Sequence, residues 1–341
     1  MTKDPLDLAA LERWLSALVP VQGPLTAERI GGGQSNPTFR VRAGQGRWVV
    51  RKKPPGVLVP SAHAVEREYR VMHALTKSAV PVPPLIGLCE DPSVLGTAFY
   101  VMEHVDGRVL WDPALPEVES AERAAMYESL NRVLAAIHGV DLAKTGLVDY
   151  GRPGNYFERQ VARWAKQYRA TSEFRIHAMD RLCDWLAAHI PDSDESTLIH
   201  GDYRLDNVMF HPTEPRIVAV LDWELSTLGH PLADVAYQAM TWRFAPGDFR
   251  GMAGRDLPAL GIPSEREYLE AYCARVGRAL PSDELWSFAI ACSMFRLAAI
   301  LHGIALRAAQ GNAVGDNAAA TGQSARVIAD LAWQQVEAMN A

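Results

Sequence analysis

Cysteine is scarce in this sequence of 341 residues: only four are present, and no two of them form a C-x-x-C pair. A structural zinc site needs clustered cysteines, and small disulfide-stapled domains need a closely spaced set. The sequence therefore argues against a zinc cluster and a disulfide framework, and favours a reducing compartment. With 48% hydrophobic and 22% charged residues, the chain can bury a core without such staples.

Long apolar runs are also missing. No stretch of about 18 uninterrupted apolar residues occurs, which is the length that a membrane-spanning helix requires. Residues 1–5 (Met-Thr-Lys-Asp-Pro) carry an early acid in place of the apolar segment of a signal peptide. We therefore expect no transmembrane helix, no membrane partner and a cytoplasmic location.

A strong excess of basic residues is absent as well. The net charge is −6, divided into +3 for residues 1–105 and −9 for the remainder. Because a nucleic-acid partner requires a strongly basic face, none is expected. A mildly basic first third would suit phosphate groups, and an acidic remainder would suit a divalent cation. Solvated surface charge is an equally good interpretation of both.

The first third alternates strand-like and turn-like patterns. Residues 39–42 and 48–51 are β-branched or aromatic enough for strands, and Ala-Gly-Gln-Gly at 43–46 predicts a hairpin turn between them. Apolar spacing predicts a helix over 64–75, and the run 97–102 predicts a further strand. We expect a small, mostly antiparallel sheet with one helix.

From about residue 116 the pattern changes to long helices. Two short apolar runs, 197–201 and 217–222, predict strands within this part. We place a boundary near residue 105, between lobes at 1–105 and 106–341. The helices are predicted at 121–137, 156–168, 178–190, 265–310 and 318–339.

The strongest chemical signal is the segment His-Gly-Asp-Tyr-Arg-Leu-Asp-Asn at 200–207. It contains Asp202 and Asn207, and Asp222 ends the next predicted strand, so we expect the three side chains on two loops of one β-hairpin. Phosphoryl transfer needs a carboxylate that accepts the hydroxyl proton, and an amide and a second carboxylate that hold Mg²⁺. The alternative is a set of polar turn residues, and we interpret Asp206 as a loop cap.

His-Gly-Asp-x-x-x-x-Asn followed by a short strand and Asp resembles the catalytic and metal loops of the aminoglycoside phosphotransferase and choline kinase superfamily, which is related to the protein kinases. The resemblance implies a bilobal α+β fold of the protein-kinase type, with a small antiparallel sheet and one helix in one lobe and a larger, mainly helical lobe. It implies Asp202 as catalytic base, Asn207 and Asp222 as Mg²⁺ ligands, and ATP as phosphoryl donor.

The rest of the nucleotide site follows from the same resemblance. The turn Gly-Gly-Gly-Gln-Ser-Asn at 31–36 lies just before a predicted strand, and glycine permits close approach of the backbone to phosphates. Its predicted cofactor-binding members are Gly32, Gly33, Ser35 and Asn36.

A cation on the following strand should hold the nucleotide phosphates. Period-2 alternation places Arg51 and Lys53 on one face of the strand and Lys52 on the other. We choose Arg51, with Lys53 second; a solvated strand-edge charge is the alternative. Of two candidate carboxylate partners on the next helix, Glu68 fits the superfamily pattern better than Glu66.

The strand 97–102 and the residues after it resemble the hinge that binds adenine. The backbone carbonyl of Glu103 and the N–H of Val105 would bind the base, and Met102 would pack on it or belong to the core. Further along, Gly-His-Pro-Leu-Ala-Asp at 229–234 resembles a superfamily motif in which His230 replaces an Asp. Asp234 would brace the catalytic loop or cap a helix.

Segments at 31–39, 50–56, 152–160 and 295–300 look closest to phosphotransferase-like domains that occur alone in bacteria and fused to acyl-CoA dehydrogenases in animals. This implies a small hydroxylated acceptor, a hydroxy acid or a hydroxyacyl thioester. The open alternatives are a nucleotide-binding pseudokinase-like module and a protein kinase, although no D-F-G or A-P-E segment is present.

The acceptor site is expected between the catalytic loop and the C-terminal helices. The Gly- and Pro-rich segment 245–263 is either a lid that closes on the acceptor or a surface insertion. Candidate residues of the acceptor site are Tyr156, Arg159, Trp242, Arg243, Arg296 and His302.

Overall fold

The computed structural model describes residues 6–30, 36–56, 63–170, 174–309 and 318–339. A five-stranded antiparallel sheet forms the first lobe, in the order β1-β2-β3-β5-β4. The predicted hairpin is confirmed: β2 and β3 pair across the turn in which Gly44 adopts a φ of +55°. The strands are β1 (Thr26–Ile30), β2 (Thr38–Ala43), β3 (Gly46–Lys52), β4 (Leu85–Cys89) and β5 (Phe99–Glu103).

Both faces of this sheet are covered by helices. The predicted helix is present as α2 (Val65–Leu75), on the face to which Tyr100 points. The other face, with Phe99 and Val101, packs against α1 (Leu8–Ser16), near the short α3 (Pro92–Leu95). The expectation of one helix in this lobe was therefore wrong. The sheet must cover two apolar faces because alternate residues of β5 are apolar on both sides.

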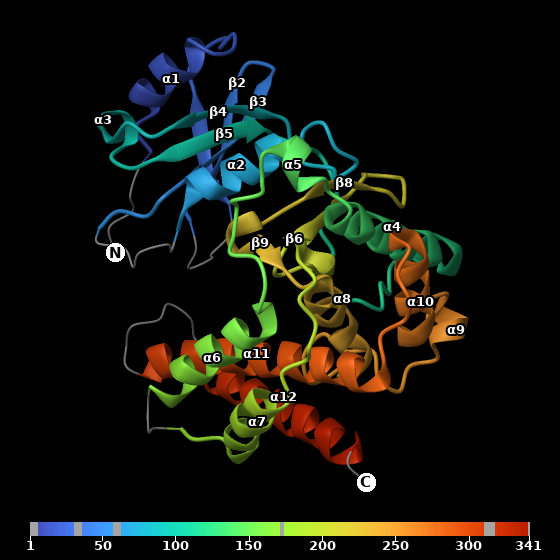
Figure 1. The fold of residues 1–341 in the computed structure, drawn as a ribbon. Helices are drawn as coiled ribbons and strands as arrows, with labels where there is room; N and C mark the ends of the chain where they lie inside the picture. The colour runs from blue at the N-terminus through green and yellow to red at the C-terminus, as the bar shows by residue number, and fades with distance from the viewer. Residues whose placement is uncertain (1–5, 31–35, 57–62, 171–173, 310–317, 340–341) are drawn as a thin grey trace.

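The second lobe is mainly helical, as predicted, and most of its helices lie below the sheet in Figure 1. The stretch predicted to be helical over 265–310 contains two helices, because Gly277 adopts a left-handed conformation that ends the first of them. The helices are α4 (Ser120–His138), α5 (Leu142–Thr145), α6 (Tyr156–Arg169), α7 (His177–Ala188), α8 (Pro231–Ala239), α9 (Leu257–Leu260), α10 (Glu265–Val276), α11 (Asp283–Ala309) and α12 (Ala318–Met339).

Helix α11 is long and apolar enough to cross a membrane by length and composition. However, 67% of its most apolar window is buried inside the protein. It packs against α12, α6 and α8 at the centre of the helical lobe. Its hydrophobicity is thus accounted for by its place in the core.

Two small antiparallel sheets lie between the large sheet and the helical bundle. One pairs β6 (Thr197–Ile199) with β9 (Thr227–Gly229), and the other pairs β7 (Val208–Phe210) with β8 (Ile217–Val220). The expectation of one hairpin was therefore wrong. Two further strands, β7 and β9, provide the backbone partners that β8 and β6 need. Short 3₁₀ segments complete the region at Leu205–Asn207, Trp223–Leu225 and Met240–Trp242.

Candidate active site

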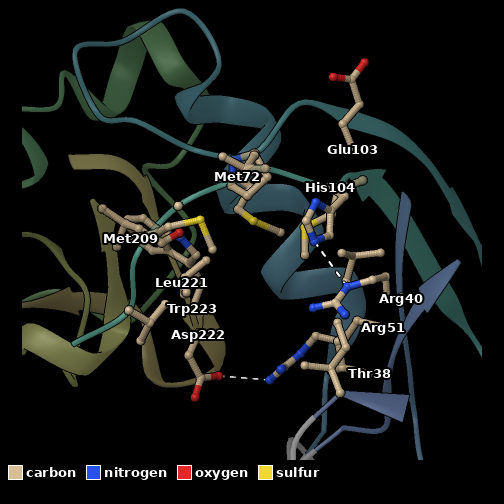
Figure 2. Close-up of a pocket in the computed structure, with 18 of the residues that line it drawn as sticks. Thr38, Arg40, Arg51, Met72, Glu103, His104, Met209, Leu221, Asp222 and Trp223 are labelled. Atoms are coloured by element: carbon tan, nitrogen blue, oxygen red, sulfur yellow. Dashed lines mark hydrogen bonds and ion pairs between the residues drawn. The ribbon is translucent and has the colours of Figure 1, made fainter. Parts of the chain in front are cut away.

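A cleft of about 660 Å³ lies between the large sheet and the β7–β8 hairpin (Figure 2). This volume is in the range of sites for small molecules and cofactors. The cleft brings together predicted residues that are far apart in the sequence, from both lobes. These are Asn36, Arg51, Met102, Glu103, Val105, Asn207 and Asp222.

The loop after β6 places Asp202 next to this cleft. The Asn207 amide donates hydrogen bonds to the Asp202 carboxylate, at 2.7 Å, and to its backbone carbonyl, at 2.8 Å. The loop turns at Gly201, whose φ is +82° and where an added Cβ would lie 2.5 Å from the carbonyl oxygen of Leu225. Only glycine therefore fits at this turn.

Asp234, at the start of α8, holds the same loop through hydrogen bonds to its backbone. Its carboxylate is fully buried and accepts backbone N–H bonds from His200, at 2.6 Å, and Gly201, at 2.8 Å. Burial would raise the pKa of Asp234, but His138 and these backbone donors outweigh it and lower the pKa. The predicted bracing of the catalytic loop by Asp234 is confirmed.

Arg51 is the charged centre of the cleft. The predicted ion pair with Glu68 is present at 2.8 Å. The same guanidinium lies 2.9 Å from Asp222 (Figure 2) and 3.4 Å from Glu224. Burial would lower the pKa of Arg51, yet the carboxylates, Glu68 foremost, raise it. The guanidinium is therefore held charged where phosphate groups would bind. Glu224 was not predicted, although it lies only two residues after Asp222.

Glu68 is itself fixed by its neighbours. Its carboxylate accepts hydrogen bonds from Asn36, at 2.7 Å, and from the Tyr100 hydroxyl, at 3.0 Å.

The predicted alternation of Arg51, Lys52 and Lys53 between the two faces of the strand is confirmed. Lys52 is buried and donates to the backbone carbonyl of Leu95, whereas Lys53 pairs with Glu66 at 2.6 Å. The other predicted members of the phosphate-covering turn, Gly32, Gly33 and Ser35, lie outside the described residues.

The end of β5 forms the side of the cleft expected to receive adenine. Met102 and Val105 line it, whereas the Glu103 side chain points away from the other labelled residues in Figure 2. Sequence reasoning missed the apolar side chains that complete this surface. The available signal was their position beside predicted polar residues: Leu221 precedes Asp222, and Met209 follows Asn207 by two positions. These apolar residues are Val49, Met72, Met209 and Leu221.

The side chains that could coordinate a metal ion in this cleft are one amide and one carboxylate. The amide nitrogen of Asn207 is used toward Asp202, which leaves its oxygen as the potential ligand, and Asp222 faces the same cleft. Within the described residues no group of three or more His, Cys, Asp or Glu could hold a metal ion. Mg²⁺ does not need one, since it binds through one or two carboxylates and completes its octahedron with phosphates and water. The residues present therefore fit Mg²⁺ bound together with a nucleotide.

Two further residues that sequence reasoning did not select contact this loop. Arg204 lies 3.5 Å from Asp202 and 3.2 Å from Asp206. Tyr237, on α8, is buried beside Asp202, and burial together with that carboxylate raises its pKa. The interpretation of Asp206 as a loop cap was wrong. Its carboxylate pairs with Arg204 and with Arg250 instead.

The segment 245–263 is packed against the helical lobe. Met252 and Ile262 are buried, and the segment contains α9. Arg250 ties it to the catalytic loop through Asp206 and lies over the ring of Trp111 at 4.6 Å. These anchors favour a fixed segment over a freely moving lid.

Most of the predicted acceptor residues already have partners within the protein. Arg243 pairs with Glu265, the Trp242 indole donates to a backbone carbonyl, and His302 bonds the carbonyl of Phe174. Arg159 donates to two backbone carbonyls, and Tyr156 is buried. Arg296 is buried, and its guanidinium lies 4.8 Å from the ring centre of Tyr237.

His230 caps α8 in place of the Asp of the superfamily motif. Its Nδ1 accepts the backbone N–H of Leu232 at 3.2 Å, and its Nε2 lies 2.9 Å from the Ser193 hydroxyl. Burial, with help from the charges of Arg278 and His138, lowers the pKa of His230 from 6.5 to about 4. The imidazole ring of His230 is therefore neutral in the folded protein.

This pKa predicts a pH-dependent loss of stability. Because the folded pKa is below the unfolded value, the contribution of His230 is complete above pH 6.5 and is lost as the pH falls toward 4. The free energy of unfolding should fall by about 3 kcal/mol from this group. His230→Asn keeps a capping side chain that does not titrate. Urea unfolding at pH 7.5 and 4.5 should show that the variant loses less unfolding free energy over this pH range than the wild type does. Equal losses in the two proteins would refute the assignment of this pH dependence to His230.

Comparison with known proteins gives a family match over most of the chain. The sequence profile of the Phosphotransferase enzyme family matches residues 26–285. The matched span includes the whole five-stranded sheet and the loops that carry Asp202 and Asp222.

Two curated relatives are similar over almost the whole chain. Acyl-CoA dehydrogenase family member 10 of Mus musculus is 46% identical over 329 residues, 95% of this chain and 30% of that protein. Acyl-CoA dehydrogenase family member 11 of Rattus norvegicus is 42% identical, over 96% of this chain and 43% of that protein. The chain thus spans less than half the length of these relatives.

Solved structures share the fold. A Ralstonia eutropha protein, assigned provisionally as an aminoglycoside phosphotransferase, is 51% identical with a TM-score of 0.89, covering 98% of this chain and 99% of that one. The aminoglycoside phosphotransferase APH(4)-Ia, in a ternary complex with AMP-PNP and hygromycin B, is 19% identical with a TM-score of 0.59, covering 94% and 98%. These likenesses confirm the expected bilobal α+β fold of the protein-kinase type.

Proposed function

Because this chain belongs to the Phosphotransferase enzyme family, as its catalytic-loop motif predicted, we propose that it transfers the γ-phosphoryl group of ATP to a hydroxyl of a small molecule. The observation that carries the proposal is the juxtaposition of the Asp202–Asn207 pair with the Arg51–Asp222 pair at one cleft. The Asp202–Asn207 pair supplies an acceptor for the hydroxyl proton, and the Arg51–Asp222 pair supplies charges for the phosphate groups.

The proposed reaction begins with the acceptor hydroxyl at the Asp202 carboxylate. As the hydroxyl oxygen forms its bond to the γ-phosphorus, the bond from that phosphorus to the oxygen of ADP breaks, and the hydroxyl proton goes to Asp202. Asn207 holds the carboxylate in place through the 2.7 Å hydrogen bond. Positioning of this kind contributes much of phosphoryl-transfer catalysis.

The nucleotide would occupy the cleft, with its phosphates at Arg51 and its base beside Met102 and Val105. APH(4)-Ia, which shares the fold, was solved with AMP-PNP, and this supports nucleotide binding by this chain. Asn207 and Asp222 would hold Mg²⁺, which neutralises charge on the phosphates when bound. The proposed acceptor is a hydroxy acid or a hydroxyacyl thioester.

Two other functions are distinguishable from this one. A protein kinase would need an activation segment, and the sequence has no D-F-G or A-P-E motif. A nucleotide-binding module without transfer would not need Asp202, Asn207 and Asp222 together, and all three are present.

A melting experiment followed by an acceptor screen tests the proposal. The melting temperature should rise with ATP and Mg²⁺ and rise less when EDTA removes the metal. A panel of small hydroxylated compounds should then include at least one that becomes phosphorylated. A nucleotide-induced shift without transfer to any compound would favour the binding module, and transfer only to proteins would favour a protein kinase.

A further inference from the structure

Three buried polar side chains connect helix α10 with the catalytic loop. The Tyr272 hydroxyl lies 2.7 Å from Nδ1 of His138, and Nε2 of His138 lies 3.3 Å from the Asp234 carboxylate. The three side chains come from α10, α4 and α8, and α10 lies beside α4 (Figure 1). We call them the buried relay. Because buried polar groups need their hydrogen-bond partners, the relay fixes these helices relative to one another.

The orientation of the His138 ring follows from its two neighbours. An ionised carboxylate can only accept hydrogen bonds, so Nε2 of His138 carries a proton that faces Asp234. The Tyr272 hydroxyl bonds the opposite nitrogen of the ring. A histidine that is bonded through both nitrogens has a fixed ring plane, so Tyr272 helps to determine where the Nε2 proton points.

Asp234 transmits this constraint to the catalytic loop through His200. Its carboxylate accepts the backbone N–H of His200 at 2.6 Å. The His200 ring donates from Nε2 to the carbonyl of Leu221, at 2.8 Å, and accepts the backbone N–H of Asp202 at Nδ1, at 3.2 Å. Leu221 directly precedes Asp222 in the sequence. His200 therefore connects the backbone of the proposed base with that of the proposed metal ligand.

We propose that Tyr272 and His138 are positioning residues for phosphoryl transfer, acting on the catalytic loop through Asp234. The proposal rests on the proposed function, and neither residue lines the nucleotide cleft. Together they hold Asp234 in the place from which it sets the position of His200, and hence the separation of the base from the metal loop. A displacement of about 1 Å in reacting groups can cost on the order of 100-fold in rate.

Helix α10 offers a matched control one helical turn from Tyr272. Tyr268 is equally buried, but its hydroxyl has no hydrogen-bond partner among the described residues. Tyr272→Phe and Tyr268→Phe therefore each remove one buried hydroxyl from the same helix, and only the first interrupts the relay. At the next position, His138→Leu removes the donor to Asp234, whereas His138→Gln keeps a nitrogen donor close to the place of Nε2.

The first measurement needs neither nucleotide nor acceptor. Exchange of the two backbone N–H groups that Asp234 accepts, followed by NMR, reports how firmly the catalytic loop is held. Their exchange should be about 10-fold faster in Tyr272→Phe and in His138→Leu, because a buried hydrogen bond is lost in each. It should be less affected in His138→Gln and unchanged in Tyr268→Phe. Unchanged exchange in Tyr272→Phe, or an equal acceleration in all helices of the lobe, would overturn the proposal.

The second measurement is steady-state kinetics on a productive acceptor. Tyr272→Phe should lower kcat by about 10-fold and leave KM for ATP unchanged, because the relay acts on the loop and not on the nucleotide cleft. His138→Leu should lower kcat at least as much, His138→Gln should recover part of the loss, and Tyr268→Phe should match the wild type. A purely structural role would lower the melting temperature and leave kcat unchanged, and this result would contradict the proposal.

The two measurements also separate this proposal from the proposed function. If the loop amides respond as expected but the wild type phosphorylates no acceptor, the proposed function fails, and the positioning role in transfer fails with it. If the wild type is active and neither the loop amides nor kcat respond to Tyr272→Phe and His138→Leu, the positioning role fails and the proposed function stands.

Discussion

The Asp202→Asn variant is expected to lose about 10²- to 10⁴-fold in kcat while it keeps its affinity for ATP. An amide has nearly the shape of a carboxylate and can still accept the hydrogen bond from Asn207, so the loop should keep its geometry. It cannot accept the acceptor's proton. Asp202 is not among the residues that line the nucleotide cleft, and removal of its charge should therefore leave nucleotide binding intact.

The control for this variant is Asp184→Asn. Asp184 is an exposed aspartate of α7 that pairs with Arg169 on the surface, so it undergoes the same chemical change far from the cleft. Steady-state kinetics on a productive acceptor, with ATP affinity from calorimetry, separate the two effects. Turnover of Asp202→Asn close to that of Asp184→Asn would exclude Asp202 as the base.

The Asp222→Asn variant is expected to lose the Mg²⁺-dependent part of nucleotide binding. Asp222 has a left-handed backbone, with a φ of +61°, and asparagine tolerates this conformation whereas alanine would add strain. The substitution therefore removes the charge without disturbing the turn. Since Mg²⁺ binds through very few protein carboxylates, the loss of one should be severe. The ratio of ATP affinities with and without Mg²⁺ should approach one.

Two comparisons make this result specific. In EDTA, wild type and Asp222→Asn should bind ATP with similar affinity, apart from the loss of the ion pair with Arg51. Glu66→Gln, a substitution of a carboxylate that pairs with Lys53 outside the cleft, should retain the full Mg²⁺ effect. A variant that responds to Mg²⁺ as the wild type does would show that Asp222 is not a metal ligand.

The elements that could be predicted were those whose sequence pattern is local. The β2–β3 hairpin has a glycine turn between two β-branched runs, and α2 and α12 have apolar residues at helical spacing, so each was found. The strands β7 and β9 were missed because three-residue strands are too short for a periodic pattern. Their existence follows from backbone hydrogen bonding with β8 and β6, which depends on the tertiary fold.

The residues of the candidate site likewise divide into those that the sequence pattern predicts and those that depend on the tertiary fold. Asp202, Asn207 and Asp222 lie within one stretch of fixed spacing, and the Arg51–Glu68 pair could be inferred from strand alternation followed by a helix. The partners of the other arginines could not be inferred, because they depend on which carboxylates the tertiary fold brings near them. Arg243 pairs with Glu265 and Arg204 with Asp206, and only the packed structure shows either pair.

The most direct test of the central claim is the fate of the γ-phosphoryl group itself. ATP labelled with ¹⁸O at its non-bridging γ-oxygens is incubated with Mg²⁺, the protein and an acceptor that the screen identified. The masses of the products are then measured by mass spectrometry. Transfer to a hydroxyl predicts a phosphate ester of the acceptor that retains all of the labelled oxygens, formed by the wild type and almost absent with Asp202→Asn. Label found only in inorganic phosphate or in unchanged ATP, with every acceptor of the panel, would contradict a phosphotransferase.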